Sequence, residues 1–267
     1  MHLRQEILKS VLLLAFMSLI FVYMGFKQAF AENSRLSIFA AASLIDLLPK
    51  ALESYKKHQD NGVEVTFNFQ GSQNLAFQIG QGASPDIFFS ADERWMTYVS
   101  KKGWVFEPKA FLANSLVFVL SPNIAGHVKS LMDLQKNDLS FAIAHSSVPV
   151  GGYTKKVLDN LSGLYGKKFT KAVRDQVVTY EDSVRNVILK VTYGSVDAGI
   201  VYKTDYLSVK DKGVLAIEIP KQANIKAYYY VAILKRSDSL NEAKSFINFL
   251  SSKEANGIFK EFGFESI

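Results

Sequence analysis

The sequence contains no cysteine in its 267 residues and only four histidines. Without cysteine no disulfide can form, so the stability of the fold must come from hydrophobic cores of adequate size. With so few histidines and no thiolates, bases for proton transfer and ligands for a bound cation are scarce. We therefore expect neither a cofactor nor a site for a free metal cation.

Catalytic and nucleotide-binding motifs are missing as well. No G-x-S-x-G, H-E-x-x-H, P-loop or G-x-G-x-x-G pattern occurs. His145 has no acid or nucleophile beside it in an accepted catalytic motif. These absences favour a protein that is not an enzyme. A hydrolase stays open as the alternative of a different class, and an assay with broad ester and peptide substrates distinguishes the two.

A concentration of charge of one sign is also absent. Lysine and arginine number 31 against 25 aspartates and glutamates, which gives a formal net charge of +6. The first 31 residues hold Arg4, Lys9 and Lys27 against Glu6, so +2 of this total lies there and +4 remains. The excess is scattered, unlike the basic stripe of a nucleic-acid-binding protein, and no nucleic acid is expected as a partner. With 48% hydrophobic and 21% charged residues, the composition indicates a globular protein.

One long apolar run occurs, and it lies at the start of the chain. Residues 1–9 carry Arg4 and Lys9, residues 11–24 are almost wholly apolar, and Ala29–Ala31 gives the small-x-small pattern that a signal peptidase reads. The run is shorter than the roughly 20 residues that span a bilayer, which disfavours a membrane anchor. No cysteine stands at the cleavage point for acylation. We expect a cleaved signal peptide and a monomer that diffuses freely in the periplasm.

Apolar strands and amphipathic helices alternate along the rest of the chain. Strands are predicted at residues 36–40, 63–69, 86–89, 116–120, 139–144, 177–178, 198–201, 214–217 and 229–233. Helices are predicted at residues 44–55, 75–79, 92–103, 153–164 and 184–193, with a terminal helical stretch from 240 to 259. The alternation predicts an α/β protein with two parallel or mixed sheets.

No repeat, low-complexity segment or flexible linker separates the two α/β units. We therefore predict two lobes joined by strands that cross between them, each lobe a mixed sheet flanked by helices, with the ligand cleft between the lobes. The predicted division is a signal peptide at 1–31, lobe 1 at 32–115, lobe 2 at 116–231, and C-terminal helices at 232–267 that return to lobe 1.

Four strand-to-helix junctions present hydroxyls or bare amides instead of charges, and these are candidate anion sites. Ser43 follows three alanines and Ser72 follows Gly71; at both places the following helix directs free amides and its positive dipole end toward the same point. The alternative for either serine alone is a helix N-cap, which contributes about 1 kcal/mol. Pro49 weakens the dipole argument at Ser43, because a proline inside a helix kinks it.

The other two junctions lie in the second half of the chain. Val148–Tyr153 predicts a proline-set turn with consecutive amides ahead of a helix, which is typical of an anion nest or of an ordinary tight turn. Glu181–Arg185 begins a helix. Tyr202 ends a strand with a phenol that either donates to a ligand or packs in the core.

In combination these segments are specific, and they make the chain resemble the periplasmic molybdate-binding proteins over residues 35–264. The segments that carry the resemblance are Phe39–Leu44, Gln78–Ile79, Gly82–Asp92, Trp95–Met96, Asn114–Val117, Val148–Pro149 with Gly151 and Tyr153, Glu181–Asp182 with Val184–Arg185, Gly199–Tyr202, and Phe259–Lys260 with Phe262–Phe264. Any one of them alone is weak.

The resemblance implies a type II periplasmic binding protein that captures molybdate or tungstate and delivers it to an ABC permease and its ATPase at the inner membrane. In that family the oxyanion is held by two serine hydroxyls, backbone amides and a tyrosine hydroxyl. Matched by motif, the molybdate-binding residues are Ser43, Ser72, Val150, Val184 and Tyr202. Molybdenum is then bound as an oxyanion.

None of the matched positions is acidic, so the implied shell consists of donors only. Such a shell suits an unprotonated dianion and leaves the proton of phosphate without an acceptor. Sulfate has the same shape and charge with shorter bonds, and it stays open as an alternative ligand. Val150 stands where alanine is usual, His145–Ser146 replaces Asp-Pro, and Gln73–Asn74 lies in a loop that is usually richer in serine. These departures leave the choice between molybdate and tungstate open.

Tyr228–Tyr230 offers a second alternative, the phenolate cluster of an iron-binding relative. Alternation along a strand places Tyr229 on the opposite face from its neighbours, so strand packing is the simpler interpretation. Visible absorbance after addition of ferric ion distinguishes the two.

Overall fold

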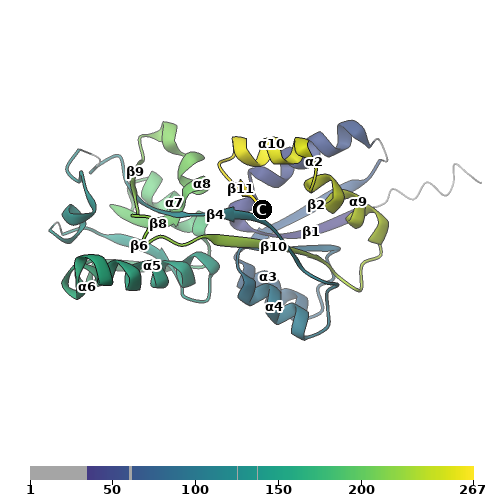
Figure 1. Cartoon of the computed structure of the whole chain (residues 1–267), viewed down its shortest axis with the longest axis horizontal. Coiled ribbons are helices and arrows are strands. Elements are labelled where there is room, and N and C mark those ends of the chain that lie inside the picture. The colour runs from purple at the N-terminus through teal and green to yellow at the C-terminus, as the bar shows by residue number, and fades with distance from the viewer. Residues whose placement is uncertain (1–34, 60–61, 125, 137) are drawn as a thin grey trace, which may run out of the picture.

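The structure is a computed structural model that describes residues 35–59, 62–124, 126–136 and 138–267. It has two lobes, each a sheet flanked by helices (Figure 1), which confirms the predicted fold class. The predicted signal peptide at 1–31 lies outside the described residues. Within the described part of the chain, no helix has the length and apolar character needed to cross a membrane.

Lobe 1 is built on a six-stranded sheet in the order β11-β4-β10-β3-β1-β2. β1 pairs in parallel with β2 and β3, whereas β10 runs antiparallel to β3 and β4. Helices α3 and α4 cover one face, and α2, α9 and α10 cover the other (Figure 1). The strands are β1 Arg35–Ala41, β2 Glu64–Gln70, β3 Ile87–Ser90, β4 Lys109–Asn114, β10 Ala227–Ile233 and β11 Glu265–Ser266; the helices are α2 Leu47–His58, α3 Ser72–Gly80, α4 Glu93–Lys101, α9 Leu240–Leu250 and α10 Lys253–Glu261, with a 3-10 turn η1 at Ala42–Leu44.

Lobe 2 is built on a five-stranded sheet in the order β7-β6-β8-β5-β9. β5 and β8 are buried along their whole length, which is why their sequences are continuous apolar runs. The strands are β5 Leu116–Leu120, β6 Phe141–Ala144, β7 Val177–Glu181, β8 Ala198–Tyr202 and β9 Leu215–Glu218; the helices are α5 Pro149–Tyr165, α6 Lys167–Asp175, α7 Val184–Thr192 and α8 Lys203–Leu207, with 3-10 turns η2 Leu131–Gln135 and η3 Lys210–Lys212.

Within residues 35–267, as far as the structure describes them, the chain crosses between the lobes twice. Ser115 joins β4 to β5, and residues 219–226 join β9 to β10. The predicted division at residue 231 falls inside β10, which belongs to the sheet of lobe 1. Periodicity predicts that a strand lies there but cannot say which sheet it joins, because β10 pairs with β3 and β4, more than a hundred residues away. The C-terminal helices α9 and α10 pack on α2 in lobe 1.

One local prediction was wrong, and the alternative of a helix N-cap at Ser43 and Ser72 is not observed. The segment Val148–Tyr153 is no turn: Pro149 occupies the first position of α5, where its missing N–H and fixed φ suit the start of a helix. Ser43 and Ser72 are not N-caps, since Ala41 and Gly71 hold those positions and neither helix has a side-chain cap. Both serine hydroxyls are therefore available for other contacts.

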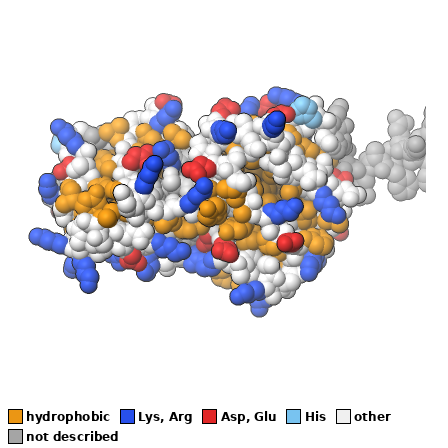
Figure 2. Space-filling model, in the orientation of Figure 1, with side chains coloured by type: hydrophobic (Ala, Val, Ile, Leu, Met, Phe, Trp, Pro, Cys, Tyr) orange, Lys and Arg blue, Asp and Glu red, His pale blue; other side chains and the backbone are white. Residues whose placement is uncertain are grey.

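Charged side chains are spread over the face of the molecule shown in Figure 2. Lys and Arg alternate with Asp and Glu across both lobes, with no basic stripe on this face. Several charged side chains of the described residues form ion pairs within about one turn of a helix, such as Lys155 with Asp159 at 2.8 Å. This distribution agrees with the scattered charge of the sequence.

Candidate functional site

The five residues matched by motif lie around one cavity between the lobes, which we call the inner cavity. Lobe 1 and the loops that follow its strands contribute Ala41, Ala42, Ser43, Gly71, Ser72 and Ala91; lobe 2 contributes Val148, Pro149, Val150, Val184 and Tyr202. None of these side chains is charged. The inner cavity measures about 10 Å³ on a scale on which one water needs about 10 to 15 Å³, so in this arrangement of the lobes it has room for about one water, and a larger guest requires the lobes to move apart.

Helix N-termini from both lobes meet at the inner cavity. Ser72 is the first residue of α3, Val150 the second of α5 and Val184 the first of α7. The first N–H groups of a helix have no acceptor within the helix, and the positive end of its dipole lies there. Backbone amides of both lobes are thus placed to donate to an anion without any cation in the wall.

Three hydroxyls complete the inner cavity. Ser72 is fully buried, and its Oγ accepts a hydrogen bond of 3.1 Å from the backbone N–H of Ala91. The Oγ of Ser43 lies 2.9 Å from the phenol oxygen of Tyr229. The buried hydroxyl of Tyr202 has no hydrogen-bond partner among the described residues. Burial raises the pKa of Tyr202 well above its usual value, so this phenol keeps its proton and can only serve a guest as a neutral group.

The lobes touch directly beside the inner cavity. The Nε2 of Gln73 in α3 donates a hydrogen bond of 2.8 Å to the carbonyl oxygen of Asp182 in lobe 2. A Cβ on Gly71 would lie 2.5 Å from the same carbonyl oxygen, which is closer than real contacts allow. Gly71 is therefore required by this contact between lobes and not by its own backbone angles, which any residue adopts (φ −59°, ψ 138°).

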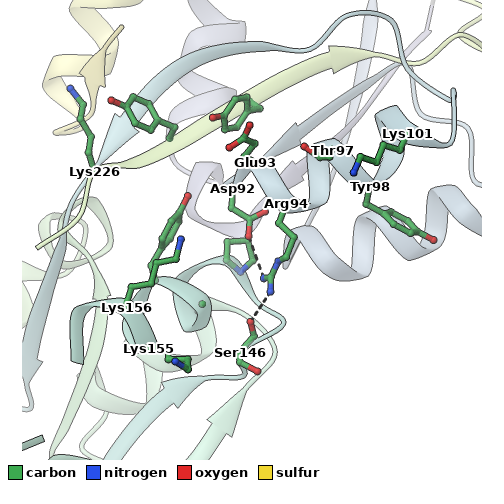
Figure 3. Close-up of a pocket in the computed structure, with 15 residues that line it drawn as sticks. Asp92, Glu93, Arg94, Thr97, Tyr98, Lys101, Ser146, Lys155, Lys156 and Lys226 are labelled. Carbon is green, nitrogen blue, oxygen red and sulfur yellow. Dashed lines mark hydrogen bonds and ion pairs between the residues drawn. The ribbon is translucent and has the colours of Figure 1, made fainter. Parts of the chain in front are cut away.

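Outside the inner cavity the cleft widens into an outer groove with a volume of about 930 Å³. Figure 3 shows its charged lining, with Arg94 extending from α4 toward Ser146 of lobe 2. Arg94 donates to the carbonyl oxygens of Ser146 at 3.1 Å and Ser147 at 2.6 Å, and the indole of Trp95 donates to Ser147 at 2.7 Å. The charged residues of the outer groove are Asp92, Glu93, Arg94, Lys101, Lys155, Lys156 and Lys226.

A third contact between lobes lies beyond η1. Arg185 of α7 forms an ion pair with Asp46 of lobe 1. The same guanidinium lies with its Nε 3.6 Å from a carboxylate oxygen of Asp205, a buried residue of lobe 2. Burial raises the pKa of Asp205 to about 6, against the opposing effect of Arg185. With contacts of this kind at both ends of the cleft, the lobes are in a closed arrangement.

Sequence reasoning missed the residues that hold the lobes together. Asp92–Trp95 follows β3 at a fifth strand-to-helix junction, which was passed over because it carries charges. Gln73 was noted only as a departure from the usual loop, whereas it forms a contact between lobes. Asp92, Glu93 and Arg94 directly after a buried strand are a signal that could have drawn attention to this junction.

The structure places the residues on which the iron-binding and catalytic alternatives depend. Tyr229 is fully buried and points to Ser43, whereas Tyr228 and Tyr230 line the outer groove, so the three phenols do not converge. Across the described ranges, no cluster of three or more His, Asp or Glu side chains is placed to hold a metal ion. His145 stacks on Tyr180 at 5.4 Å between ring centres and lies in neither the inner cavity nor the outer groove.

Comparisons with known proteins agree with this geometry. The model of the bacterial extracellular solute-binding protein family matches residues 36–265. A molybdate-binding protein of Mycobacterium tuberculosis is 33% identical over 228 residues, which cover 85% of this chain and 83% of that protein. The substrate-binding domain of a molybdenum ABC transporter from Clostridium difficile is 31% identical with a TM-score of 0.66, and the match covers 88% of this chain and 99% of that one. A sulfate-binding protein of Mycobacterium tuberculosis shares the fold, with a TM-score of 0.76 at 17% identity and coverage of 88% and 87%.

Proposed function

Because the chain belongs to the family of bacterial extracellular solute-binding proteins, we propose that it captures molybdate, and also tungstate, for delivery to an ABC importer. Family membership also confirms that the chain is a binding protein and not an enzyme. The observation that carries the choice of ligand is the inner cavity, where Ser43, Ser72, Val150, Val184 and Tyr202 from both lobes surround one uncharged space. The most similar relatives above are named for molybdenum or molybdate.

The chemistry of the inner cavity suits an oxyanion that carries no proton. Each of its polar groups can donate a hydrogen bond to an oxyanion, and no carboxylate is present to accept a proton from the guest. Hydrogen bonds to a charged group contribute about 1.5 to 3 kcal/mol each, so a few of them offset the desolvation of a dianion. Molybdate, tungstate and sulfate meet this requirement at neutral pH, whereas phosphate retains a proton.

Size must separate molybdate from sulfate, since shape and charge are the same. Val150 and Val184 bring branched side chains to the wall of the inner cavity, and both are buried. Their methyl groups set how far the lobes close over a guest. Sulfate is therefore the second candidate ligand. It is favoured by Val150, because valine brings extra methyl groups to a position where alanine is usual.

Ligand capture is proposed to be a hinge motion of the two lobes. The ligand bridges donors that only the closed form brings together, so binding shifts the population toward that form. The motion occurs at the two crossings, Ser115 and residues 219–226, because the backbone passes between the lobes there, whereas contacts such as Gln73 with Asp182 and Arg94 with Ser146 are made by side chains. We propose the lobe boundaries that the sequence predicts, with one change: β10 belongs to lobe 1.

The cellular setting is part of the proposal. Residues 1–31 serve as a cleaved signal peptide, and the monomeric mature protein works in the periplasm. The closed form docks on a membrane permease that is driven by an ATPase. Export is tested by N-terminal sequencing of the secreted protein, which should begin at Glu32.

Calorimetric titration of the purified protein with molybdate, tungstate, sulfate and phosphate tests the ligand. We expect binding of the first two, weaker binding of sulfate and none of phosphate. Ser43→Ala or Ser72→Ala should each weaken molybdate binding by about 1.5 to 3 kcal/mol, because each removes a hydrogen bond to a charged group. Ser121→Ala is the matched control, since Ser121 is equally buried but lies outside the inner cavity. Full affinity in both cavity variants would refute the site.

A further inference from the structure

Three charged residues meet at the contact between lobes beyond η1, and we call them the Arg185 triad. Asp46 lies in lobe 1 between η1 and α2, whereas Arg185 in α7 and Asp205 in α8 belong to lobe 2. The guanidinium of Arg185 forms an ion pair with Asp46 across the lobes, and its Nε lies 3.6 Å from an oxygen of Asp205. One cation is therefore shared by two carboxylates, of which only Asp205 moves with it.

Asp205 is poorly satisfied in this arrangement. Its side chain is 1% exposed, and no hydrogen bond of ordinary length reaches either of its carboxylate oxygens from the described residues. The Nε of Arg185 is buried without a hydrogen-bond partner as well. Burial raises the pKa of Asp205 to about 6, which leaves the group mostly ionised at neutral pH. A buried charge without hydrogen bonds is costly, so this carboxylate favours any arrangement that brings the guanidinium closer.

The guanidinium of Arg185 is turned away from Asp205 by two other groups. One terminal nitrogen reaches Asp46, and the other donates a hydrogen bond of 3.0 Å to the Oγ of Ser208. Ser208 in turn donates to the backbone carbonyl oxygen of Asp205 at 2.8 Å. Ser208, Asp205 and Arg185 all belong to lobe 2, so only the contact with Asp46 is lost when the lobes separate. The guanidinium is then free to turn its N–H groups to the two oxygens of Asp205.

The Arg185 triad is tied closely to the inner cavity. Each member follows a residue of that cavity along the chain: Asp46 stands three positions after Ser43, Arg185 one after Val184 and Asp205 three after Tyr202. Any movement that separates Asp46 from Arg185 therefore also separates the hydrogen-bond donors of the two lobes. The charges of the triad and the donors of the inner cavity respond to the same hinge motion.

We propose that Asp205 competes with Asp46 for Arg185, so that Asp205 favours the open form, Asp46 favours the closed form, and their balance sets how tightly the protein holds its anion. This inference rests on the proposed anion site and hinge motion. In the open form Arg185 satisfies the buried Asp205, whereas closure divides the cation between two acids. The cost keeps the ligand-free protein open and is offset when an anion joins the donors of both lobes.

Two substitutions act on this balance in opposite directions. Asp205→Asn removes the charge that draws Arg185 back into lobe 2 and nearly keeps the shape of the side chain, so closure should become easier. Asp46→Ala removes the attraction across the lobes. The side chain of Asp46 makes no capping hydrogen bond to α2, so the helix should form as before. Glu53→Ala is the matched control, because Glu53 is an exposed acid of lobe 1 whose two ion pairs stay within α2.

Small-angle X-ray scattering measures the separation of the lobes without any ligand. The ligand-free wild type should have a larger radius of gyration than the molybdate-bound wild type, and ligand-free Asp205→Asn should lie between the two. Asp46→Ala and Glu53→Ala should keep the value of the ligand-free wild type. A ligand-free wild type as compact as the bound form, or Asp205→Asn no more compact than the ligand-free wild type, overturns the inference.

Calorimetry with molybdate and with sulfate measures the effect on binding. Asp205→Asn should bind both anions about three- to tenfold more tightly, because up to one hydrogen bond to a charged group no longer opposes closure. Stopped-flow measurement should show slower release. Asp46→Ala should bind about two- to fivefold more weakly, which is the range of an exposed ion pair. Glu53→Ala should bind like the wild type.

The double variant Asp46→Ala/Asp205→Asn separates competition from direct repulsion. A negative charge near the inner cavity also repels an anion, but that repulsion does not depend on Asp46. Competition does depend on it, so in the Asp46→Ala background Asp205→Asn should no longer raise the affinity. A gain of the same size in both backgrounds would show that Asp205 acts by repulsion alone and would overturn the inference.

Two further outcomes are distinguishable from these. If thermal melting shows that Asp205→Asn does not fold, Asp46→Ala decides, and wild-type affinity in that variant overturns the inference. A wild type that binds no tetrahedral anion refutes the proposed function itself. The scattering of the ligand-free variants still tests the Arg185 triad in that case, since it requires no ligand.

Discussion

The inner cavity and the outer groove share one cleft but differ in every property that matters to an anion. The inner cavity measures about 10 Å³ and has no charged side chain in its wall, whereas the outer groove measures about 930 Å³ and contains both carboxylates and cations. A tetrahedral anion that enters the cleft would meet the cations of the outer groove first, yet the hydrogen-bond donors converge on the uncharged inner cavity. Selectivity thus depends on the size of the inner cavity, on its hydrogen-bond donors and on closure of the lobes. Charged side chains act in the outer groove, in contacts such as that of Arg94 with Ser147.

The largest effect is expected from placing a charge in the inner cavity. Ser72→Asp puts a carboxylate among the donors at a fully buried position. It should reduce molybdate affinity more than about a thousandfold, because a buried unpaired charge costs about 3 to 5 kcal/mol and repels the dianion. Calorimetry measures the loss, and Ser72→Ala separates the added charge from the missing hydroxyl. Equal losses in the two variants would show that the neutrality of the inner cavity is unimportant.

A smaller effect is expected from preventing closure. In Gly71→Ala the new Cβ would lie 2.5 Å from the carbonyl oxygen of Asp182 in lobe 2 and also 2.4 Å from the Oε1 of Gln73, whose side chain donates to that carbonyl. Overpacking of this size costs about 1 to 3 kcal/mol, so affinity should fall by about ten- to a hundredfold while the melting temperature without ligand changes little. Gly257→Ala is the control, since a Cβ there meets nothing within 4 Å. Wild-type affinity in Gly71→Ala would contradict the closed arrangement of the lobes.

Removing a contact of the outer groove should have a still smaller effect. Arg94→Ala deletes hydrogen bonds between lobes from a side chain that is 49% exposed, so a cost of about 1 kcal/mol is expected. Stopped-flow measurement should show molybdate dissociating about fivefold faster. Lys101→Ala removes a cation from the same groove without touching this contact and should leave dissociation unchanged. If Lys101→Ala had the larger effect, the charge of the groove and not the contact would govern release.

The smallest effect is expected from pH. Loss of a donor proton would weaken binding as pH rises, but burial raises the pKa values of Tyr202 and Tyr229 above the usual value for tyrosine, so both phenols keep their protons in this range. Serine hydroxyls and backbone amides do not titrate in this range. Sulfate and molybdate affinities should therefore vary less than about twofold between pH 7 and 9. A tenfold decline would reveal an ionisable donor in the site.

The sequence predicted the parts of the fold that depend on local pattern. The strands from β1 to β9 that it placed, and the helix start at Val184, follow from periodicity and from the residues at the junctions, whereas α3 begins at Ser72, three residues before the predicted helix at 75–79. The five candidate site residues came from a family resemblance, and the structure brings them around one cavity. The placement of β10 in the first sheet had no such signal, because antiparallel pairing between distant segments is not encoded in local alternation. The strand β4 and the helix α6 were not predicted, although Phe169, Thr170 and Val173 give α6 one buried face.

Contacts between lobes were even less accessible from the sequence. Tyr229 and Ser43 are 186 residues apart, and their hydrogen bond exists only because β10 returns to lobe 1 beside β4. The sequence indicated that Tyr229 faces away from its neighbours, which is confirmed, but it could not name what Tyr229 meets. Arg94 and Gln73 were hidden for the same reason, since their partners Ser147 and Asp182 belong to the other lobe.

The most direct test of the neutral, donor-lined site is a crystal structure of the protein with molybdate, with data collected at the molybdenum absorption edge. The anomalous signal should be a single peak in the inner cavity, with oxygens within hydrogen-bond distance of the hydroxyls of Ser43, Ser72 and Tyr202 and of the backbone N–H groups of Val150 and Val184. A peak in the outer groove beside Lys155, Lys156 or Lys226, with the inner cavity empty, would contradict the account.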